Sequence, residues 1–508
     1  MPVGLLSSYD RAVRAFVERP WLLPAAGSIV AICAFQLWID PANPPGFHRD
    51  EASLSLNAYS IETTLHDEDG NLLPLFFRSF GDYKSPFYPY LLAGVFRVTG
   101  PSQGVARGFS AVLVLAGILL LGLLAKRVTG DWLVAAAVIV LAGLTPWLFE
   151  LGRLAIEAST QPLLVTGLLL VLHRTWQRGR WRLGEAAAAG ALLGLLTYSY
   201  TGSRLLAPLL ALALLVFAAR GRWRWLAAAW GTFAAFLVPL AVYGLRHPGT
   251  LTARYRETTI ARNGLSGPRL VVQAISNWLH DANPWYWATT GDPAPYIHVG
   301  GTYASLFAAG VALALAGLVL VFLHERDNLW WRYVVLCLFL APVPAALTVD
   351  RHNAIRLATL PIFVLVLAIP ALAELRRAVR GSWVARGLVA VLVAAVGFQF
   401  VQFLDAYRTN GPGRLVLFDA GVVPLLAKPF ADGKTVYIDH DDRDASTEAQ
   451  WHAVADGLPR SRISILPDGG IPPRGAVVFG RFQPCDYVCV KTATWDAYWV
   501  ARADGPKP

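Results

Sequence analysis

The chain is short of charge and of sulfur. Of its 508 residues only 15% are Asp, Glu, Lys or Arg, whereas 55% are hydrophobic, and the mean hydropathy is +0.46. Soluble globular domains carry far more charge than this. The apolar residues also fall in runs of about twenty, the length that a helix needs to cross roughly 30 Å of hydrocarbon. These proportions exclude an ordinary soluble protein and indicate a membrane protein with several spans.

The four cysteines and the single methionine leave little room for sulfur chemistry. No zinc-type pair of cysteine pairs exists and we expect no metal site, although a divalent cation stays open as a cofactor. Cys33 and Cys337 lie inside apolar runs and are expected to be small buried hydrophobes. Cys485 and Cys489 lie in the hydrophilic tail, where a disulfide is permitted if the tail is outside the cytosol and the chain turns at Pro484.

Acidic residues are outnumbered, which gives a net charge of +10, but this excess does not indicate nucleic acid binding. The arginines stand in short clusters between apolar runs and form no basic face or tail. When the spans alternate in direction, every cluster falls on one side of the membrane, as the positive-inside rule requires. Arg11, Arg14 and Arg19 precede the first apolar run without a clear cleavage site. We therefore expect a retained first helix and a cytoplasmic N-terminus.

This alternation predicts a bundle of about eleven transmembrane helices over residues 1–404. The expected spans lie near residues 21–38, 105–124, 132–149, 162–172, 184–198, 205–218, 226–243, 303–323, 334–347, 354–372 and 384–404. The predicted fold class is thus an all-α polytopic membrane bundle.

Two hydrophilic regions fall outside the membrane in this scheme. Residues 41–104 form a first external loop, with one short apolar piece, Phe87 to Val98, expected to lie in the membrane interface. An odd number of spans places the tail, residues 405–508, on the same side. Strands expected near 435–438, 476–479 and 487–492 indicate that this tail is a small α/β domain.

Charged side chains next to hydrocarbon are costly and are therefore candidates for function. On the predicted outer side, Asp50 and Glu51 follow the first span, and Lys84 lies at the far end of the same loop. A carboxylate can remove a proton from an attacking hydroxyl, and Lys or Arg can hold a phosphate. This combination is the minimum needed to move a group from a lipid phosphate to an acceptor.

Each of these residues also has a purely structural explanation. Asp50 and Glu51 can cap a helix that begins near Ala52, and Lys84 can extend to the lipid headgroups. Arg153 and Glu157 stand four residues apart and, on one helix, can form an ion pair. Structural explanations also exist for the other candidates. Arg204 and Arg356 can be interface anchors, and Asp67 to Gly70 can form a solvated turn. Trp285 to Trp287 can belong to an interfacial aromatic belt.

Several stretches, taken in order along the chain, resemble bacterial family-39-type glycosyltransferases. This group is related to protein O-mannosyltransferases and to the aminoarabinose transferase that modifies lipid A. The stretches are Asp50-Glu51-Ala52, Asn57 to Ser60, Asp67 to Gly70, Leu73-Pro74-Leu75, Arg78 to Pro86, Arg153 to Glu157, Tyr198 to Arg204 and Arg351 to Arg356.

The resemblance implies a GT-C fold, whose first external loop carries the catalytic acid. It implies transfer of a sugar from a polyprenyl-phosphate carrier to an acceptor on the outer side, with inversion. Asp50 would be the general base, Glu51 its neighbour in the motif, and Lys84 a contact of the carrier phosphate. Ser85 departs from the group's Lys-Pro-Pro-Leu-like stretch. The other implied site residues are Glu157 (catalytic), Arg153, Arg204 and Arg356 (phosphate or carrier), and Tyr59, Asp82, Tyr83, Tyr200, Arg351 and His352 (substrate).

Two other functions share part of this pattern. A transporter or flippase also carries charges in its helices, but transporters usually show two related halves, and no half-repeat is visible. A polysaccharide ligase or polymerase uses the same carrier on longer chains. We therefore expect a glycosyltransferase of the bacterial inner membrane. Its partners would be a polyprenyl-phosphate-linked sugar, membrane lipids and an acceptor that is a lipid, glycan or protein.

Overall fold

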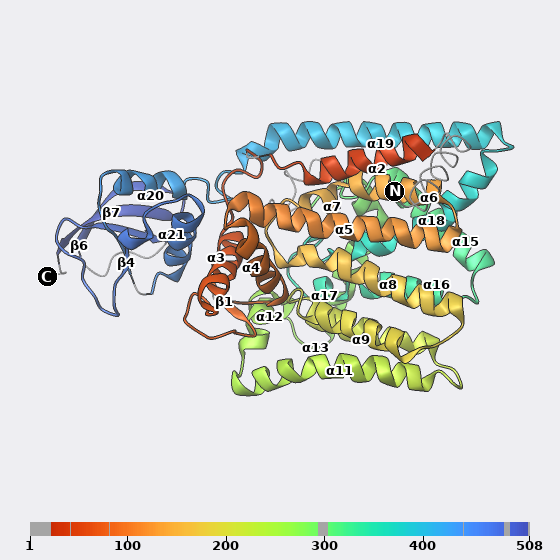
Figure 1. Ribbon diagram of the computed structural model, residues 1–508, viewed down its shortest axis with the longest axis horizontal. Helices are drawn as coiled ribbons and strands as arrows, with labels where there is room; N and C mark the ends of the chain where they lie inside the picture. The colour runs from red at the N-terminus through yellow and green to blue at the C-terminus, as the bar shows by residue number, and fades with distance from the viewer. Residues whose placement is uncertain are drawn as a thin grey trace, which may run out of the picture.

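The computed structural model describes residues 22–40, 42–80, 82–292, 303–439, 441–481 and 488–505. Long helices make up most of it, and a five-stranded sheet forms the C-terminal part (Figure 1). Every span expected from the sequence overlaps a helix. These helices are α2 (Leu22–Leu37), α5 (Gln103–Thr129), α6 (Trp132–Leu144), α8 (Gln161–Arg178), α9 (Leu183–Thr197), α10 (Ser203–Ala213), α11 (Trp223–Arg246), α15 (Ala308–His324), α16 (Leu329–Leu340), α18 (Leu360–Ala378) and α19 (Trp383–Asn410).

The helices have the composition of membrane spans. Among them, α5, α11, α16 with the following α17 (Val343–Ala346), and α19 are long and apolar enough to cross a membrane. Further apolar helices, such as α2, α6, α9 and α15, have 10–17 residues. The chain is therefore a multi-pass membrane protein with the expected all-α bundle. Arg11, Arg14 and Arg19, on which the orientation of the first helix depends, lie outside the described residues.

Small residues allow the helices to pack closely. A Cβ atom on Gly317 of α15 would lie 1.8 Å from the carbonyl oxygen of Leu367 in α18, and one on Gly190 of α9 would lie 2.2 Å from that of Ala229 in α11. Any larger residue at these two positions would force the helix backbones apart. Close backbone approach of this kind is how helices associate where no water is present to drive burial.

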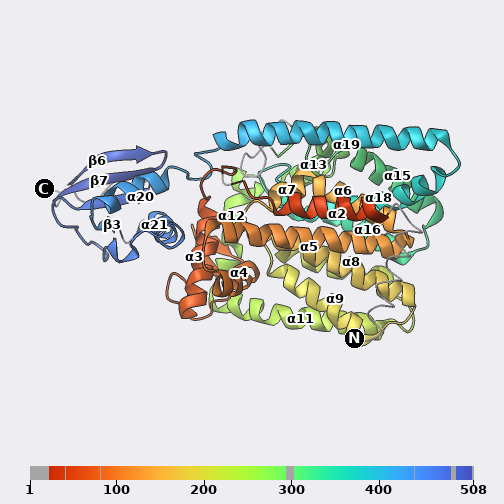
Figure 2. The same ribbon diagram turned by 45° about the horizontal axis from the view of Figure 1, so that its top comes forward.

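The first hydrophilic region is folded and covers one end of the bundle (Figures 1 and 2). It contains α3 (Arg49–Thr64), the antiparallel strands β1 (Phe77–Ser79) and β2 (Asp82–Lys84), and α4 (Phe87–Thr99). The expected short helix near Phe87 to Val98 is therefore confirmed as α4. Helix α12 (Ala253–Thr258) lies at the same end.

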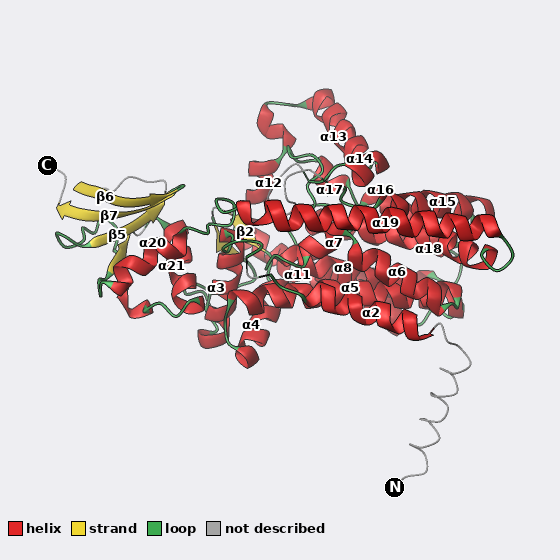
Figure 3. Ribbon diagram, turned by 90° about the horizontal axis from the view of Figure 1, so that it is seen from above, coloured by secondary structure: helices red, strands yellow, loops and turns green. Residues whose placement is uncertain are grey.

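The helices between α11 and α15 leave the main bundle. In the view from above, α13 (Gly267–Asp281) and α14 (Pro284–Thr289) project from its side (Figure 3). Trp285, expected in an aromatic belt, is 70% exposed on α14. At the end of the bundle opposite α3, an ion pair joins two of the turns that carry basic residues. It connects Arg376, in the last turn of α18, with Asp131, the cap of α6 (3.5 Å).

The tail forms the expected small α/β domain at the α3 end of the bundle (Figures 1 and 3). Its sheet has the order β4-β3-β5-β7-β6, in which β3, β4 and β5 are parallel and β7 runs antiparallel to both its neighbours. Cys489 is disulfide-bonded; Cys485 lies outside the described residues. The elements are α20 (Val422–Ala431), β3 (Val436–Ile438), α21 (Arg443–Ala455), β4 (Ile463–Ile465), β5 (Val477–Arg481), β6 (Val488–Trp495) and β7 (Tyr498–Gly505).

Candidate active site

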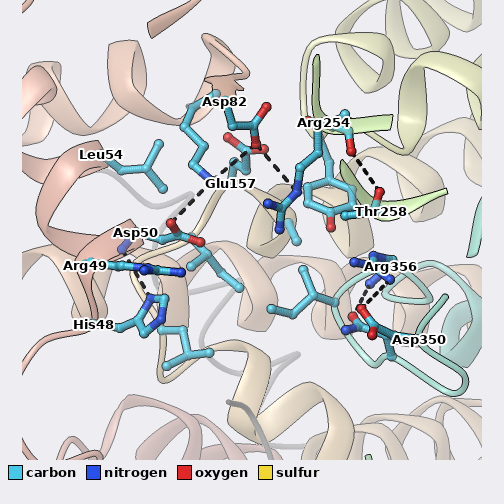
Figure 4. A pocket seen from close by; sticks show the side chains of 18 of the residues that line it. His48, Arg49, Asp50, Leu54, Asp82, Glu157, Arg254, Thr258, Asp350 and Arg356 are labelled. Atoms are coloured by element: carbon cyan, nitrogen blue, oxygen red, sulfur yellow. Dashed lines mark hydrogen bonds and ion pairs between the residues drawn. The ribbon is translucent and has the colours of Figure 1, made fainter. Parts of the chain in front are cut away.

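A cavity of about 330 Å³ opens at the α3 end of the bundle (Figure 4). Its wall combines the start of α3, the end of β2, the turn before α8, α12 and the loop before α18. It brings together seven of the site residues expected from the sequence: Asp50, Glu51, Asp82, Lys84, Glu157, Tyr200 and Arg356.

The local sequence His48-Arg49-Asp50-Glu51 decides where the two adjacent carboxylates point. His48 caps α3, since its Nδ1 accepts a hydrogen bond from the backbone N–H of Asp50 (3.2 Å). Glu51 Oε2 accepts one from the backbone N–H of His48 (3.0 Å), which completes a capping box. Consecutive residues point about 100° apart on a helix, so Asp50 and Glu51 meet different surroundings. The expected cap is therefore wrong for Asp50, because the helix begins at Arg49 with His48 as its cap, whereas Glu51 does take part in the capping box.

Glu51 borders the cavity, but its side chain is fully buried and its carboxylate pairs with Arg107. Its two carboxylate oxygens accept hydrogen bonds from Arg107 Nε (2.9 Å) and Nη2 (2.8 Å) of α5, and Oε1 also accepts one from the backbone N–H of Ala155 (2.8 Å). Two-point pairing of this kind is strong and directional. Glu51 therefore ties the start of α3 to the membrane bundle, and its oxygens are already engaged.

Asp50 faces the cavity and pairs with Lys84. Lys84 Nζ lies 3.3 Å from Asp50 Oδ1 and 3.6 Å from Asp82 Oδ2. Because the lysine is buried, with 8% exposed, the alternative in which it extends to the headgroups is wrong. Burial by itself would raise the pKa of Asp50, but the ammonium of Lys84, together with the smaller effects of His48, Arg254 and Arg49, outweighs it and holds that pKa below its usual range. Burial likewise opposes the charge of Lys84, whose pKa is nevertheless raised by Asp50 and Asp82.

Glu157 lies in the short turn η1 (Glu157–Thr160) that precedes α8. Its Oε2 accepts a hydrogen bond from the backbone N–H of Ser85 (3.0 Å), the residue after Lys84. Burial raises the pKa of Glu157 to about 7, and the charge of Lys84 offsets this only in part. The group therefore changes protonation near neutral pH, next to the Asp50–Lys84 pair.

Arg153 does not line this cavity. The helix before it, α7 (Pro146–Leu151), ends at Leu151, so Arg153 and Glu157 do not share a helix and the expected alternative of an ion pair is wrong. Arg153 Nη1 and Nη2 instead donate to the carbonyl oxygens of Gln36 and Phe35 (2.9 Å each). These are among the last carbonyls of α2, which have no partner within their own helix.

Two arginines form the wall opposite Asp50. Arg254 of α12 lies 3.6 Å from Asp82 (Nε to Oδ2), and Arg356 Nη1 lies 2.8 Å from Asp350 Oδ2 (Figure 4). Arg254 and Arg356 also line a second cavity of about 270 Å³. Much of that second cavity is apolar, since its wall includes Leu205, Leu251, Pro344 and Leu347 as well as Arg204.

Four further expected residues, Tyr59, Tyr83, Arg351 and His352, are not part of the cavity wall. Tyr83 presents its carbonyl oxygen to Arg204 Nη2 (3.3 Å). Arg351 Nε donates to Asn277 Oδ1 (2.9 Å). The other two contacts are the guanidinium of Arg460 over the ring of Tyr59 (5.7 Å to its centroid) and His352 Nε2 with Ser305 Oγ (3.2 Å).

The cavity wall also contains residues that the sequence did not single out. They include Arg49, Arg254, Asp350 and Phe418. Arg49 has a sequence signal, because it adjoins Asp50. Arg254 lies in a stretch with three more arginines within ten residues on either side, Arg246, Arg256 and Arg262, which was a weaker signal. No local pattern marks Phe418, since it comes from the tail.

Asp50, Asp82 and Glu157 are the cavity carboxylates whose charges act on Lys84. Among the residues that the structure describes, no group of three or more His, Cys, Asp or Glu side chains is placed to hold a metal ion. Asp50 and Asp82 share Lys84 as a partner. The arrangement can therefore supply a carboxylate base next to several cations.

Residues 83–243 match the family model described as dolichyl-phosphate-mannose-protein mannosyltransferase. This stretch includes Lys84, Glu157 and Arg204, whereas Asp50 precedes it. No curated protein matches the chain in sequence.

Solved structures show the same fold. ArnT from Cupriavidus metallidurans, bound to undecaprenyl phosphate, is 14% identical, with a TM-score of 0.57 over 96% of this chain and 100% of that one. The oligosaccharyltransferase of Archaeoglobus fulgidus in its apo form is 13% identical, with a TM-score of 0.52 over 87% of this chain and 64% of that one. A second structure of the archaeal enzyme, AglB with an inhibitory peptide and a dolichol-phosphate, is 12% identical, with a TM-score of 0.50 over 85% and 64%. The resemblance to GT-C transferases is thus confirmed by the family model and the fold.

Proposed function

We propose that this protein is an integral membrane glycosyltransferase that moves a sugar from a polyprenyl-phosphate carrier to an acceptor, with inversion. The observation that carries the proposal is the ion pair of Asp50 with Lys84 in a cavity at the end of the membrane bundle. The ArnT and AglB structures named above hold undecaprenyl phosphate and a dolichol-phosphate, which belong to one class of carrier.

In this proposal Asp50 is the general base. The acceptor hydroxyl attacks the anomeric carbon of the sugar and passes its proton to the Asp50 carboxylate. The bond from that carbon to the phosphate oxygen breaks, and the leaving polyprenyl phosphate takes the electron pair. The low pKa of Asp50 keeps it ionised and ready to accept a proton. A single carboxylate that activates the nucleophile opposite the leaving group suits an inverting displacement.

Lys84, Arg254 and Arg356 would hold the leaving phosphate. Fixed cations stabilise charge that develops on a leaving group, and do so most strongly where water is excluded. An incoming phosphate would also compete with Asp50 for the ammonium of Lys84. Because that ammonium lowers the pKa of Asp50, sharing it with a phosphate would raise this pKa and make the carboxylate a stronger base when the carrier is bound.

The second cavity suits the first isoprenoid units of the carrier. It shares Arg254 and Arg356 with the polar cavity and is lined beyond them by leucine and proline side chains. If the carrier phosphate binds Arg254 and Arg356, the isoprenoid chain of the carrier would extend into the apolar second cavity. Arg204, on the wall of this cavity, would then lie near the isoprenoid chain or the phosphate of the carrier.

The proposed site faces the outer side of the inner membrane. The basic turns favour the cytoplasm by the positive-inside rule, and the cavity lies at the other end of the bundle. We propose that residues 1–404 form the catalytic membrane domain and residues 405–508 an external domain. The acceptor would be a lipid, glycan or protein that reaches the site from that side.

The proposal is tested with the purified full-length protein in detergent or liposomes. Radiolabelled polyprenyl-phosphate sugars are incubated with a membrane extract that supplies acceptors. Loss of label from the carrier that depends on the extract is the expected result. A labelled carrier that crosses the liposome membrane without losing its sugar would instead support a flippase.

A further inference from the structure

The segment that leads from α19 into the C-terminal domain packs along the segment that leads into α3. Asn43 Nδ2 donates to the carbonyl oxygen of Tyr407 (2.6 Å), and Arg414 Nη2 donates to Asn43 Oδ1 (2.9 Å). A Cβ atom on Gly46 would lie 2.4 Å from the carbonyl oxygen of Phe418. The two backbones are therefore in direct contact just before α3 begins.

Asp419 reaches the first turn of α3 from this segment. Its Oδ2 accepts a hydrogen bond from the backbone N–H of Arg49 (3.2 Å). The first N–H groups of a helix have no acceptor within it; that of Asp50 goes to His48, and that of Arg49 goes to Asp419. Asp419 has a positive φ of 48° and is 7% exposed, so a left-handed backbone directs this carboxylate inward.

The rest of the C-terminal domain presses on the same helix through α21. The ring of Trp451 stacks on Phe47 (5.4 Å between centroids) and on Phe96 of α4 (6.1 Å). Thr447 Oγ1 donates to Glu68 Oε2 (2.8 Å) in the loop after α3. These contacts hold the domain in place, but only Asp419 bonds to the turn that carries Asp50, among the C-terminal residues that the structure describes.

We propose that Asp419 is a positioning residue for Asp50, so that the C-terminal domain completes the active site. This inference rests on the proposed function. Asp50 is the second residue of α3, so its carboxylate moves with the first turn. Asp419 holds this turn from the C-terminal segment, and His48 holds it from the N-cap position. Phe418, the neighbour of Asp419, already lines the cavity.

The test compares variants that keep the left-handed backbone of residue 419. Glycine and asparagine both tolerate a positive φ, but only asparagine keeps an oxygen that can accept from Arg49. Asp419→Gly should lower kcat by about tenfold, as expected when a reacting group shifts slightly, with the KM for the carrier unchanged. Asp419→Asn should restore most of kcat.

Thr447→Ala is the matched control, because it removes a contact between the domains without touching the first turn of α3; it should keep wild-type kcat. Amide hydrogen exchange supplies a readout that does not need activity. Peptides that contain residues 49–51 should exchange faster in Asp419→Gly than in the wild type or in Thr447→Ala. If the glycine variant does not elute as a single species in detergent, Arg49→Pro replaces it in the exchange comparison, because proline is tolerated at the first position of a helix and removes the N–H that Asp419 accepts without changing residue 419.

Wild-type kcat and wild-type exchange in Asp419→Gly would overturn the inference. So would equal losses in Asp419→Gly and Thr447→Ala, which would indicate domain docking in general. If the wild-type protein turns over no carrier sugar, the proposed function fails by itself, and the exchange comparison still decides whether Asp419 holds α3.

Discussion

Lys84 Nζ lies 3.3 Å from Asp50 Oδ1, so the proposed phosphate contact and the proposed general base are each other's partner. A change at one therefore alters the chemistry of the other. Two independent surface charges would not affect one another in this way. Measuring the coupling therefore distinguishes the proposed roles from that alternative.

Replacing Lys84 with methionine should have two effects. The KM for the carrier should rise by about tenfold or more, because a charged hydrogen-bond partner of the phosphate is lost. The pKa of Asp50 should also rise, since the ammonium holds it down. The base must be ionised to work, so activity, which is lost as the pH falls through this pKa, should be lost at a higher pH than in the wild type. A pH–rate profile of kcat/KM measures this shift.

Lys126→Met is the control for Lys84→Met, because Lys126 lies in the last turn of α5, away from the cavity. It should leave both the KM and the profile unchanged. If the acid limb of the pH–rate profile were the same in Lys84→Met and in the wild type, Lys84 would not control the pKa of Asp50.

Arg254→Gln should weaken use of the carrier although the sequence did not single out this residue. Arg254 pairs with Asp82 on the wall of the polar cavity (3.6 Å) and also lines the apolar cavity. Loss of its charge should raise the KM for the carrier by about tenfold, in the range for one charge-assisted contact. Arg269→Gln, an exposed position on α13, should not. Equal KM values for the two variants would remove Arg254 from the phosphate site.

Glu51→Ala should damage stability more than chemistry. It leaves Arg107 buried without the carboxylate that now binds it twice, and breaking such a pair costs about 3–5 kcal/mol. Glu62→Ala on the same helix is the control, because its partner Arg97 is exposed and such pairs contribute about 0–1 kcal/mol. Unfolding of both variants in detergent gives the two losses. A Glu51→Ala chain as stable as Glu62→Ala would contradict the structural role.

The C-terminal domain should become less stable in alkali. His452 Nδ1 lies 2.7 Å from Asp456 Oδ2, and its Nε2 lies 3.4 Å from Glu448 Oε2. Burial opposes the charged ring, but these carboxylates raise the pKa of His452 to about 9, from 6.5. The folded-state value lies above the unfolded one, so this contribution is complete below pH 6.5 and is lost as the pH rises through 9. The shift corresponds to roughly 3 kcal/mol.

Unfolding of this domain in denaturant at pH 6.5 and pH 9.5 can be followed by mass spectrometry, from the deuterium that peptides of α21 take up in a short pulse. His452→Gln should remove most of the difference in stability between the two pH values. A difference that persists unchanged in His452→Gln would assign it to other groups.

The sequence predicted the bundle well, because a span must be long and apolar and each one is visible by itself. It also predicted the loop that carries Asp50 and Lys84, which lie next to apolar runs. The direction in which individual side chains point was harder to predict. Arg153 and Glu157 belong to one motif, yet a break after Leu151 sends them to different places.

Contacts between distant parts of the chain left no local signal. Arg254 lies in the short helix α12, whose sequence has no apolar periodicity, so no local pattern predicts its contact with Asp82. Asp419 bonds to a residue 370 positions earlier, and only the docking of the tail against α3 brings them together. The contacts of Arg254 and Asp419 could therefore be recognised only from the folded structure.

The central claim is that Asp50 is the base, and Asp50→Asn tests it most directly. The amide keeps the shape of the side chain but cannot take a proton from the acceptor, and general base catalysis contributes about 10²–10⁴-fold. We expect the variant to elute and unfold like the wild type while transfer of label from the carrier falls by that factor, with Asp405→Asn, an exposed position at the end of α19, fully active. Wild-type turnover by Asp50→Asn would contradict the account and leave Asp50 as a partner of Lys84 alone.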